Sequence, residues 1–218
     1  VRGREGSVEH VLTTEESGRT IRHLLTAPAP KADGGDWILK PDKEAGFRDR
    51  VPAFIDWALL RLRTASENPL PSIRIAMLTR DRNGTWGERI NAWDDAFVAA
   101  HAKLRERMLG DLRARALELI ETWRSAQGRP AIYFPRTSWA ALRPEADKAA
   151  SDAGSRWAGD DTSGGRHKGE REYEPGYAGL LGSGMEFDDA HSADFVHLRE
   201  FAQVLNRLIE PDTAWVAA

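Results

Sequence analysis

The sequence predicts a mixed α/β fold in which a small mixed sheet is flanked by helices. Two short β-prone runs, Val8–Thr13 and Thr20–Leu25, stand on either side of a polar stretch, as in a hairpin. Helical periodicity begins at Val51, and a further strand pair is indicated after Ile73. The chain has 218 residues, of which 41% are hydrophobic and 30% charged, so we expect one globular domain spanning residues 1–218.

The first half begins with the two antiparallel strands, and the proline- and glycine-rich stretch "TAPAPKADGGDW" is then expected to be a loop. The helix that follows carries its apolar residues at helical spacing: Val51, Phe54, Ile55, Ala58, Leu59 and Leu62. Arg61 and Arg63 are expected on its polar face, and Pro69 and Pro71 follow its end. Next, "SIRIAMLTRDRNGTW" predicts a strand, a tight turn at Asn83 and Gly84, and a second strand.

The second half is expected to be mostly helical. Residues 96–127 have helical propensity, with Gly110 expected to divide them into two helices. The stretch "IYFPRTSWAAL" indicates a strand, a corner at Pro135, and a helix capped by Thr137 or Ser138. Residues 154–176 are rich in glycine and charge and are expected to form a mobile loop. A last amphipathic helix runs from Asp194 towards Pro211.

Composition excludes several classes of protein. The formal net charge of −3 lacks the basic excess of a stand-alone nucleic-acid-binding protein. The absence of cysteine excludes disulfides and thiolate metal sites. No apolar run approaches the roughly 20 residues of a membrane helix, and no signal peptide is recognisable, so we expect a cytoplasmic protein. The first residue is Val1, which suggests a fragment of a longer polypeptide.

Nuclease chemistry with two magnesium ions requires clustered carboxylates, commonly with a lysine. Glu9 could supply the first acid, but the second strand, "TIRHLL", offers neither acid nor lysine. The contiguous Asp42, Lys43 and Glu44 are interpreted as a solvated turn. The alternative is an active nuclease in which Glu9, Asp36 and Asp42 converge, with Lys40 or Lys43 nearby.

Two further patterns have competing interpretations. Asp188, His191, Asp194 and His197 have threefold spacing, which suits either a metal site or, as we favour, the start of a helix. The basic clusters, being interleaved with acids, are interpreted mainly as solvated faces. DNA or partner contacts remain an alternative for four of their arginines and for the corner arginine, namely Arg61, Arg63, Arg80, Arg82 and Arg136. For Arg136 we favour a corner residue that pairs with a local carboxylate.

Several stretches together resemble the C-terminal part of the RecC family, the gamma subunit of exodeoxyribonuclease V. In order they are "LIETWRSAQGRP", "AIYFPRTSWAAL", "RWAGD", "GEREYEPGYAGLLG" and "DFVHLREFAQVLNRLIEP". Upstream, "FRDRVPAFIDWALLRL" and "SIRIAMLTRDRNGTW" are similar to a helix and a strand pair of that family. The resemblance spans Phe47 to Pro211, and more loosely Gly6 to Leu25, while residues 94–110 look like an additional helix.

The resemblance implies a restriction-endonuclease-like core whose catalytic site is degenerate. It implies a non-catalytic C-terminal domain of a RecC-like subunit that acts as a scaffold and handles DNA strands in double-strand break repair and homologous recombination. No catalytic residue, metal or cofactor is expected in this domain, because ATP and magnesium belong to partner subunits of the helicase-nuclease. The implied partners are RecB-like and RecD-like subunits and DNA ends. A different interpretation is a stand-alone adaptor whose 154–176 segment folds on a partner.

Overall fold

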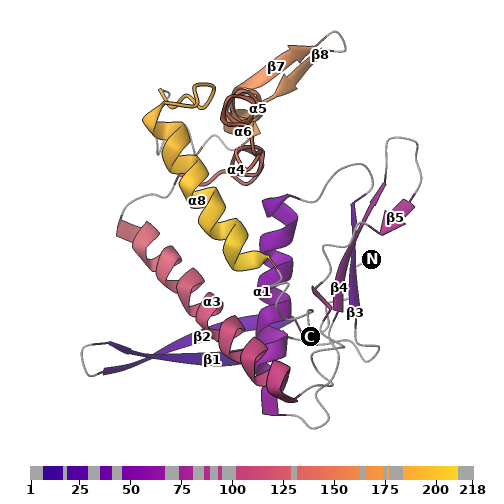
Figure 1. Cartoon of the computed structure of the whole chain (residues 1–218), viewed down its shortest axis with the longest axis vertical. Helices are drawn as coiled ribbons and strands as arrows, with labels where there is room; N and C mark the ends of the chain where they lie inside the picture. The colour runs from indigo at the N-terminus through magenta and orange to yellow at the C-terminus, as the bar shows by residue number, and fades with distance from the viewer. Residues whose placement is uncertain are drawn as a thin grey trace. The chain divides into compact units, whose positions relative to one another are not determined.

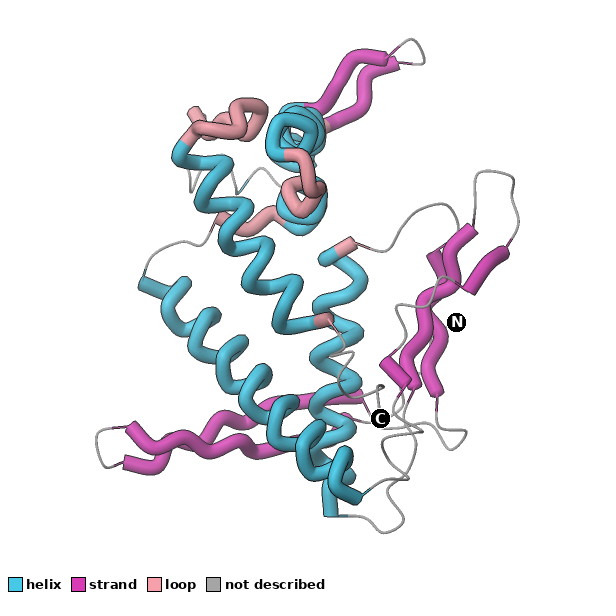
Figure 2. Tube along the Cα trace, in the orientation of Figure 1, coloured by secondary structure: helices cyan, strands magenta, loops and turns pink. Residues whose placement is uncertain are grey.

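The structure, a computed structural model, describes residues 7–16, 19–28, 35–40, 46–66, 74–80, 86–88, 93–94, 102–128, 132–162, 165–173, 176 and 184–210. These residues combine helices and strands, which confirms the expected mixed α/β class (Figure 2). The chain divides into two compact units where the sequence suggested one domain. The first unit comprises residues 1–45, 49–122 and 209–218, and the second comprises 46–48 and 123–208.

The expected N-terminal hairpin is confirmed in the first unit. Strands β1 (Ser7–Glu16) and β2 (Arg19–Pro28) form a two-stranded antiparallel sheet. Leu12 lies opposite His23 and is buried, whereas the next pair along, Val11 and Leu24, is exposed. This difference between neighbouring pairs follows from the alternation of side chains across a strand.

A strand, a helix and a parallel strand form the next part of the first unit (Figure 1). β3 (Gly35–Lys40) pairs in parallel with β4 (Arg74–Arg80), and α1 (Phe47–Arg63) lies between them in the chain, as a parallel connection requires. β5 (Trp86–Glu88) and β6 (Trp93–Asp94) pair antiparallel with β4, which completes a mixed four-stranded sheet.

The strand pair expected after Ile73 corresponds to β4 and β5, while its turn residues, Asn83 and Gly84, lie outside the described residues. The expected loop over "TAPAPKADGGDW" is wrong at both ends, where β2 reaches Pro28 and β3 begins at Gly35. β3 forms there because β4 supplies hydrogen-bonding partners from a distant part of the sequence.

Helix α1 begins at Phe47, before the expected start, and is followed by a short 3₁₀ turn, η1 (Thr64–Ser66). Its buried residues include Phe54, Trp57 and Leu59, while Ile55 is exposed. The expected position of Arg61 on the polar face is wrong, because its side chain is fully buried. The predicted apolar face of α1 is therefore buried in the main. The buried surface extends further around the helix than the apolar residues alone indicate.

Helix α3 (Ala102–Gly128) is continuous, so the expected division at Gly110 is wrong. Gly110 is exposed, and a Cβ atom added there would have no neighbour within 4 Å. An exposed glycine weakens a helix by about 1 kcal/mol, and burial of Met108 and Leu112 on the same helix offsets that cost. The additional helix expected at 94–110 is in part the beginning of α3.

Glu210 connects α1 and α3 within the first unit. The guanidinium of Arg50 donates to its carboxylate at 2.7 Å, and Arg115 donates to its backbone carbonyl. Arg115 also forms an ion pair with Asp111 on the same helix at 2.9 Å. Glu210 therefore contacts both long helices of this unit.

The second unit contains α4 (Pro135–Ala140), α5 (Ala146–Ala158), the strands β7 (Gly159–Thr162) and β8 (Gly165–Lys168), α6 (Glu170–Tyr173) and most of α8 (Ala193–Ile209). The expected loop over 154–176 is therefore wrong in its secondary structure, because the end of α5, an antiparallel hairpin and α6 occupy most of it. Figure 1 shows the hairpin leading out from the end of α5. The expected last helix is confirmed as α8.

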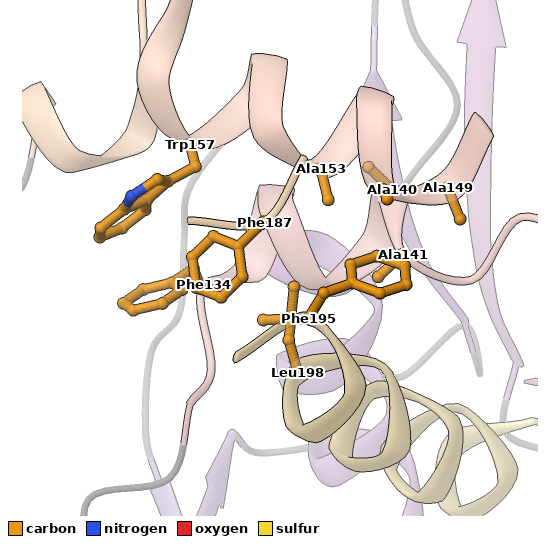
Figure 3. Packing of buried hydrophobic residues seen from close by; sticks show 10 residues of the cluster. Phe134, Ala140, Ala141, Ala149, Ala153, Trp157, Phe187, Phe195 and Leu198 are labelled. Carbon is orange, nitrogen blue, oxygen red and sulfur yellow. The ribbon is translucent and has the colours of Figure 1, made fainter. Parts of the chain in front are cut away.

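Four aromatic rings and a row of alanines form the core of the second unit (Figure 3). The ring centroids of Phe134 and Trp157 are 4.3 Å apart, and Phe187 packs against both at 5.8 and 5.4 Å. The alanines of α4 and α5 lie beside Phe195 and Leu198 of α8. Because alanine is small, these helices can approach closely while the rings fill the remaining space.

Candidate functional site

The corner at Pro135 begins helix α4, with Phe134 as its N-cap residue in an extended conformation. Pro135 suits the first helical turn because its missing N–H has no partner there in any helix. Thr137 and Ser138 were expected to cap the helix, but both lie inside it and are fully buried. The Ser138 hydroxyl accepts a hydrogen bond from the Phe134 amide at 3.1 Å, so its role is to hold the corner.

The carboxylate that caps α4 comes from Glu170, at the start of α6. It accepts hydrogen bonds from the backbone amide of Arg136 at 3.2 Å, and from the amide and hydroxyl of Thr137 at 2.9 Å each. Glu170 is only 6% exposed. A buried carboxylate facing free amides at a helix N-terminus is stabilised by both the hydrogen bonds and the helix dipole. Glu170 thus joins α6 to the corner.

Two glycines hold the base of the β7–β8 hairpin. Gly159 has a φ of 82°, and a Cβ added to it would lie 2.3 Å from the carbonyl oxygen of His167. A Cβ added to Gly169 would lie 2.1 Å from the carbonyl oxygen of Trp157. No larger residue fits where the two strands of the hairpin leave and return, so the position of Glu170 depends on both glycines.

The side chain of Arg136 lies beside an exposed aromatic ring. Its guanidinium carbon is 5.9 Å from the centroid of the Tyr173 ring, within the range of a cation–π interaction. Tyr173 is 59% exposed, and Arg171, on the same short helix, is also exposed. Arg136 is half-buried. The site therefore presents two guanidinium groups and an accessible phenol ring.

A surface recess of about 570 Å³ lies next to this site in the second unit. It is lined by the exposed side of α5, by Arg171 and by the segment 185–188. The Trp157 indole N–H donates to the Met185 carbonyl at 3.0 Å, and a Cβ on Gly154 would lie 2.7 Å from that of Asp188, so the segment is held against α5. Glu186 and Asp188 face the recess together with Arg171, which gives it charges of both signs.

The other four arginines predicted as DNA or partner contacts lie far from Arg136 in the sequence. Arg61 is fully buried on α1, and Arg63 is exposed at the end of the same helix. Arg80 is the last residue of β4, and Arg82 lies outside the described residues. Of the predicted contacts, Arg136 is the one whose described surroundings include an exposed aromatic ring within cation–π range.

The acids considered for nuclease chemistry belong to different parts of the fold. Glu9 lies on β1 in the two-stranded sheet, whereas Asp36 and Lys40 lie on β3 in the four-stranded sheet. Asp42, Lys43 and Glu44 lie outside the described residues. Within the described part of the chain, no group of three or more histidine and acidic side chains could hold a metal ion.

The residues with threefold spacing lie at the approach to α8 and in its first turns. Asp189 accepts a hydrogen bond from the His191 amide at 2.8 Å, and the Ser192 hydroxyl accepts one from the Phe195 amide at 3.1 Å. Asp194 lies in the first turn, where a negative charge interacts favourably with the helix dipole. This acidic and hydroxyl-bearing segment therefore begins a helix, as favoured above.

Glu170 and Tyr173 were missed as site residues. Glu170 accepts hydrogen bonds from a residue that is 33 positions away in the sequence, and no local sequence pattern predicts such a contact. For Tyr173, an aromatic residue next to basic residues in "RHKGEREY" is a usable signal, since basic and aromatic residues together are typical of nucleic-acid-binding surfaces.

Comparison with protein-family models, with curated proteins and with solved structures finds no match for this chain. In the described ranges, no helix combines the length and the apolar character needed to cross a membrane.

Proposed function

We propose that this chain is the non-catalytic C-terminal domain of a RecC-like subunit of the exodeoxyribonuclease V (RecBCD) complex. In this role it acts as a scaffold and handles DNA strands during double-strand break repair and homologous recombination. The observation that carries the proposal is the order and spacing of the motifs between Phe47 and Pro211. Within the described residues, those motifs fall on α1, β4, the end of α3, the corner with α4, the end of α5, α6 and α8.

The finer fold assignment is part of the same proposal. We assign the first unit to a degenerate restriction-endonuclease-like core, and its mixed sheet with a helical connection between parallel strands supports this assignment. The β1–β2 hairpin forms a separate sheet, which is a departure from a single central sheet.

The placement of the acidic residues supports a domain without catalysis. Metal-dependent nucleases bring carboxylates together around ions whose oxygen ligands lie within about 2.6 Å. Glu9 and Asp36 lie in two different sheets of the first unit. ATP hydrolysis and DNA cleavage are assigned to the RecB-like and RecD-like partners, which bind the ATP and magnesium.

A cleavage assay tests the non-catalytic assignment. The purified chain is incubated with linear duplex and single-stranded DNA in magnesium or manganese, beside a Glu9→Ala variant. We expect no cleavage above that of a buffer control. Metal-dependent nicking that disappears in Glu9→Ala would instead support an active nuclease, and association with RecB-like and RecD-like chains provides the complementary test.

A further inference from the structure

The backbone and the side chain of Arg136 have separate roles. Its backbone amide is bonded to Glu170, and this contact does not require an arginine side chain. Its guanidinium lies over the Tyr173 ring, and no ion pair joins it to a carboxylate among the described residues. The corner therefore uses the main chain of residue 136 and leaves the positive charge available for another interaction.

Two further positive charges lie close to Tyr173 in the sequence. Lys168, at the end of β8, and Arg171, on α6, are both exposed. We call Arg136, Lys168, Arg171 and Tyr173 the corner patch. It contains three positive charges and one ring that is 59% exposed.

The two acidic residues of α6, Glu170 and Glu172, make hydrogen bonds within the second unit. Glu170 is buried and its two oxygens face the amides of α4. Glu172 accepts a hydrogen bond from the Gly169 amide at 3.5 Å. The corner patch itself carries three positive charges, and Glu186 and Asp188 share the neighbouring recess with Arg171.

We propose that the corner patch binds single-stranded nucleic acid, with an unpaired base stacked on Tyr173 and phosphates held by Arg136 and Arg171. Exposed aromatic rings next to arginines bind single strands in this manner, because every base has a face that can stack. In a duplex the bases are stacked on one another, so no base face is available to stack on the Tyr173 ring. The choice of nucleic acid as ligand rests on the proposed function, which it deepens by naming residues that contact the strand.

An acidic protein segment is the competing ligand, since it could also neutralise three positive charges. It would not need an accessible aromatic face, whereas a base does. The exposure of Tyr173 beside Arg136 therefore favours the nucleic acid, and the experiment below includes an acidic peptide.

The test measures binding of the full chain to fluorescein-labelled oligothymidylate of about 16 nucleotides by fluorescence anisotropy. A strand of equal length with abasic residues, a duplex and a polyglutamate peptide serve as the other ligands. We expect the oligothymidylate to bind about tenfold more tightly than the abasic strand, because only the former can stack. We expect Tyr173→Ala to remove this difference and Tyr173→Phe to keep it.

Arg136→Ala separates the contact from the fold. The substitution leaves the backbone amide in place, so the bond to Glu170 and the far-ultraviolet circular dichroism spectrum should be unchanged. Binding of oligothymidylate should weaken, and the slope of log affinity against log salt should fall by about 0.7 for a lost phosphate contact. Lys148→Ala is the matched control, because it removes an exposed positive charge that is paired with Glu145 elsewhere in the second unit.

The inference is overturned if the abasic strand binds as tightly as oligothymidylate and Tyr173→Ala changes neither. It is also overturned if polyglutamate binds more tightly than any oligonucleotide. These outcomes are independent of whether the chain assembles with RecB-like and RecD-like subunits. A chain that assembles with these subunits but shows no base-dependent binding would support the proposed function and contradict binding at the corner patch. A chain that shows base-dependent binding but does not assemble would support binding at the corner patch and contradict the proposed function.

Discussion

Replacing Glu170 with alanine should destabilise the second unit, because a distant carboxylate satisfies the N-terminus of α4. The substitution removes the acceptor for both the amide and the hydroxyl of Thr137, a fully buried residue. It also removes the acceptor for the Arg136 amide, which is half-buried and can be reached by water more easily.

The expected cost follows from the burial of these donors. A buried donor left without a partner costs about 1–3 kcal/mol, and the loss of a charged acceptor falls at the upper end. With both donors of Thr137 affected, we expect Glu170→Ala to lower the free energy of unfolding by about 2–4 kcal/mol. Glu170→Gln should cost about 1 kcal/mol, because an amide oxygen can still accept both Thr137 hydrogen bonds.

Urea denaturation followed by circular dichroism at 222 nm measures the effect, and hydrogen exchange at the Thr137 amide localises it. The urea midpoint of Glu170→Ala should fall by about 1–2 M. Glu145→Ala is a matched control, since Glu145 stands at the N-cap of α5 but its side chain makes no capping hydrogen bond. If Glu170→Ala lay within about 0.5 kcal/mol of both wild type and this control, the capping role would be refuted.

Two glycine substitutions should act in opposite directions. Gly159→Ala should destabilise the second unit by about 2–4 kcal/mol in the same urea experiment, because a positive φ of 82° disfavours other residues and the added Cβ would meet the His167 carbonyl at 2.3 Å. A neutral result would contradict this close approach of Gly159 to the His167 carbonyl. Gly110→Ala should stabilise the first unit by about 0.5–1 kcal/mol, because the position is exposed in the continuous helix α3 and the added methyl meets nothing. A loss of stability at Gly110→Ala would show that α3 is interrupted there.

Elements whose pattern is complete within a short stretch could be predicted from the sequence. The β1–β2 hairpin follows from two β-prone runs and a turn, and α8 follows from apolar residues at helical spacing. β3 was missed because its stability depends on pairing with β4, and a helix separates the two in the sequence.

Helix α5 shows why a helix whose buried residues are small is difficult to predict from hydrophobic periodicity. Its buried face consists largely of alanines, and Gly154 was assigned to a loop because residues 154–176 are rich in glycine and charge. In the fold, Gly154 is required inside the helix, since a Cβ there would lie 2.7 Å from that of Asp188. The sequence does not indicate this close packing, because it does not show that the segment with Asp188 lies against α5.

The candidate site was predicted only in its central residue. Arg136 was recognised as either a corner residue or a contact, and the structure gives its main chain a place in the corner while its side chain lies over Tyr173. Glu170 could not be predicted, because it reaches α4 across an intervening helix and hairpin. Arg61 was expected at the surface because of its charge, but α1 buries it.

Co-purification with RecB-like and RecD-like chains tests whether this chain is part of a RecC-like subunit. The affinity-tagged chain, within its full open reading frame, is co-expressed with the RecB-like and RecD-like chains of the same genome, and the eluate is resolved by size-exclusion chromatography and mass spectrometry. We expect a stable complex that contains both chains and degrades linear duplex DNA in the presence of ATP and magnesium. Elution of the tagged chain without either partner, while the two partners assemble with another gamma subunit, would contradict the proposed function.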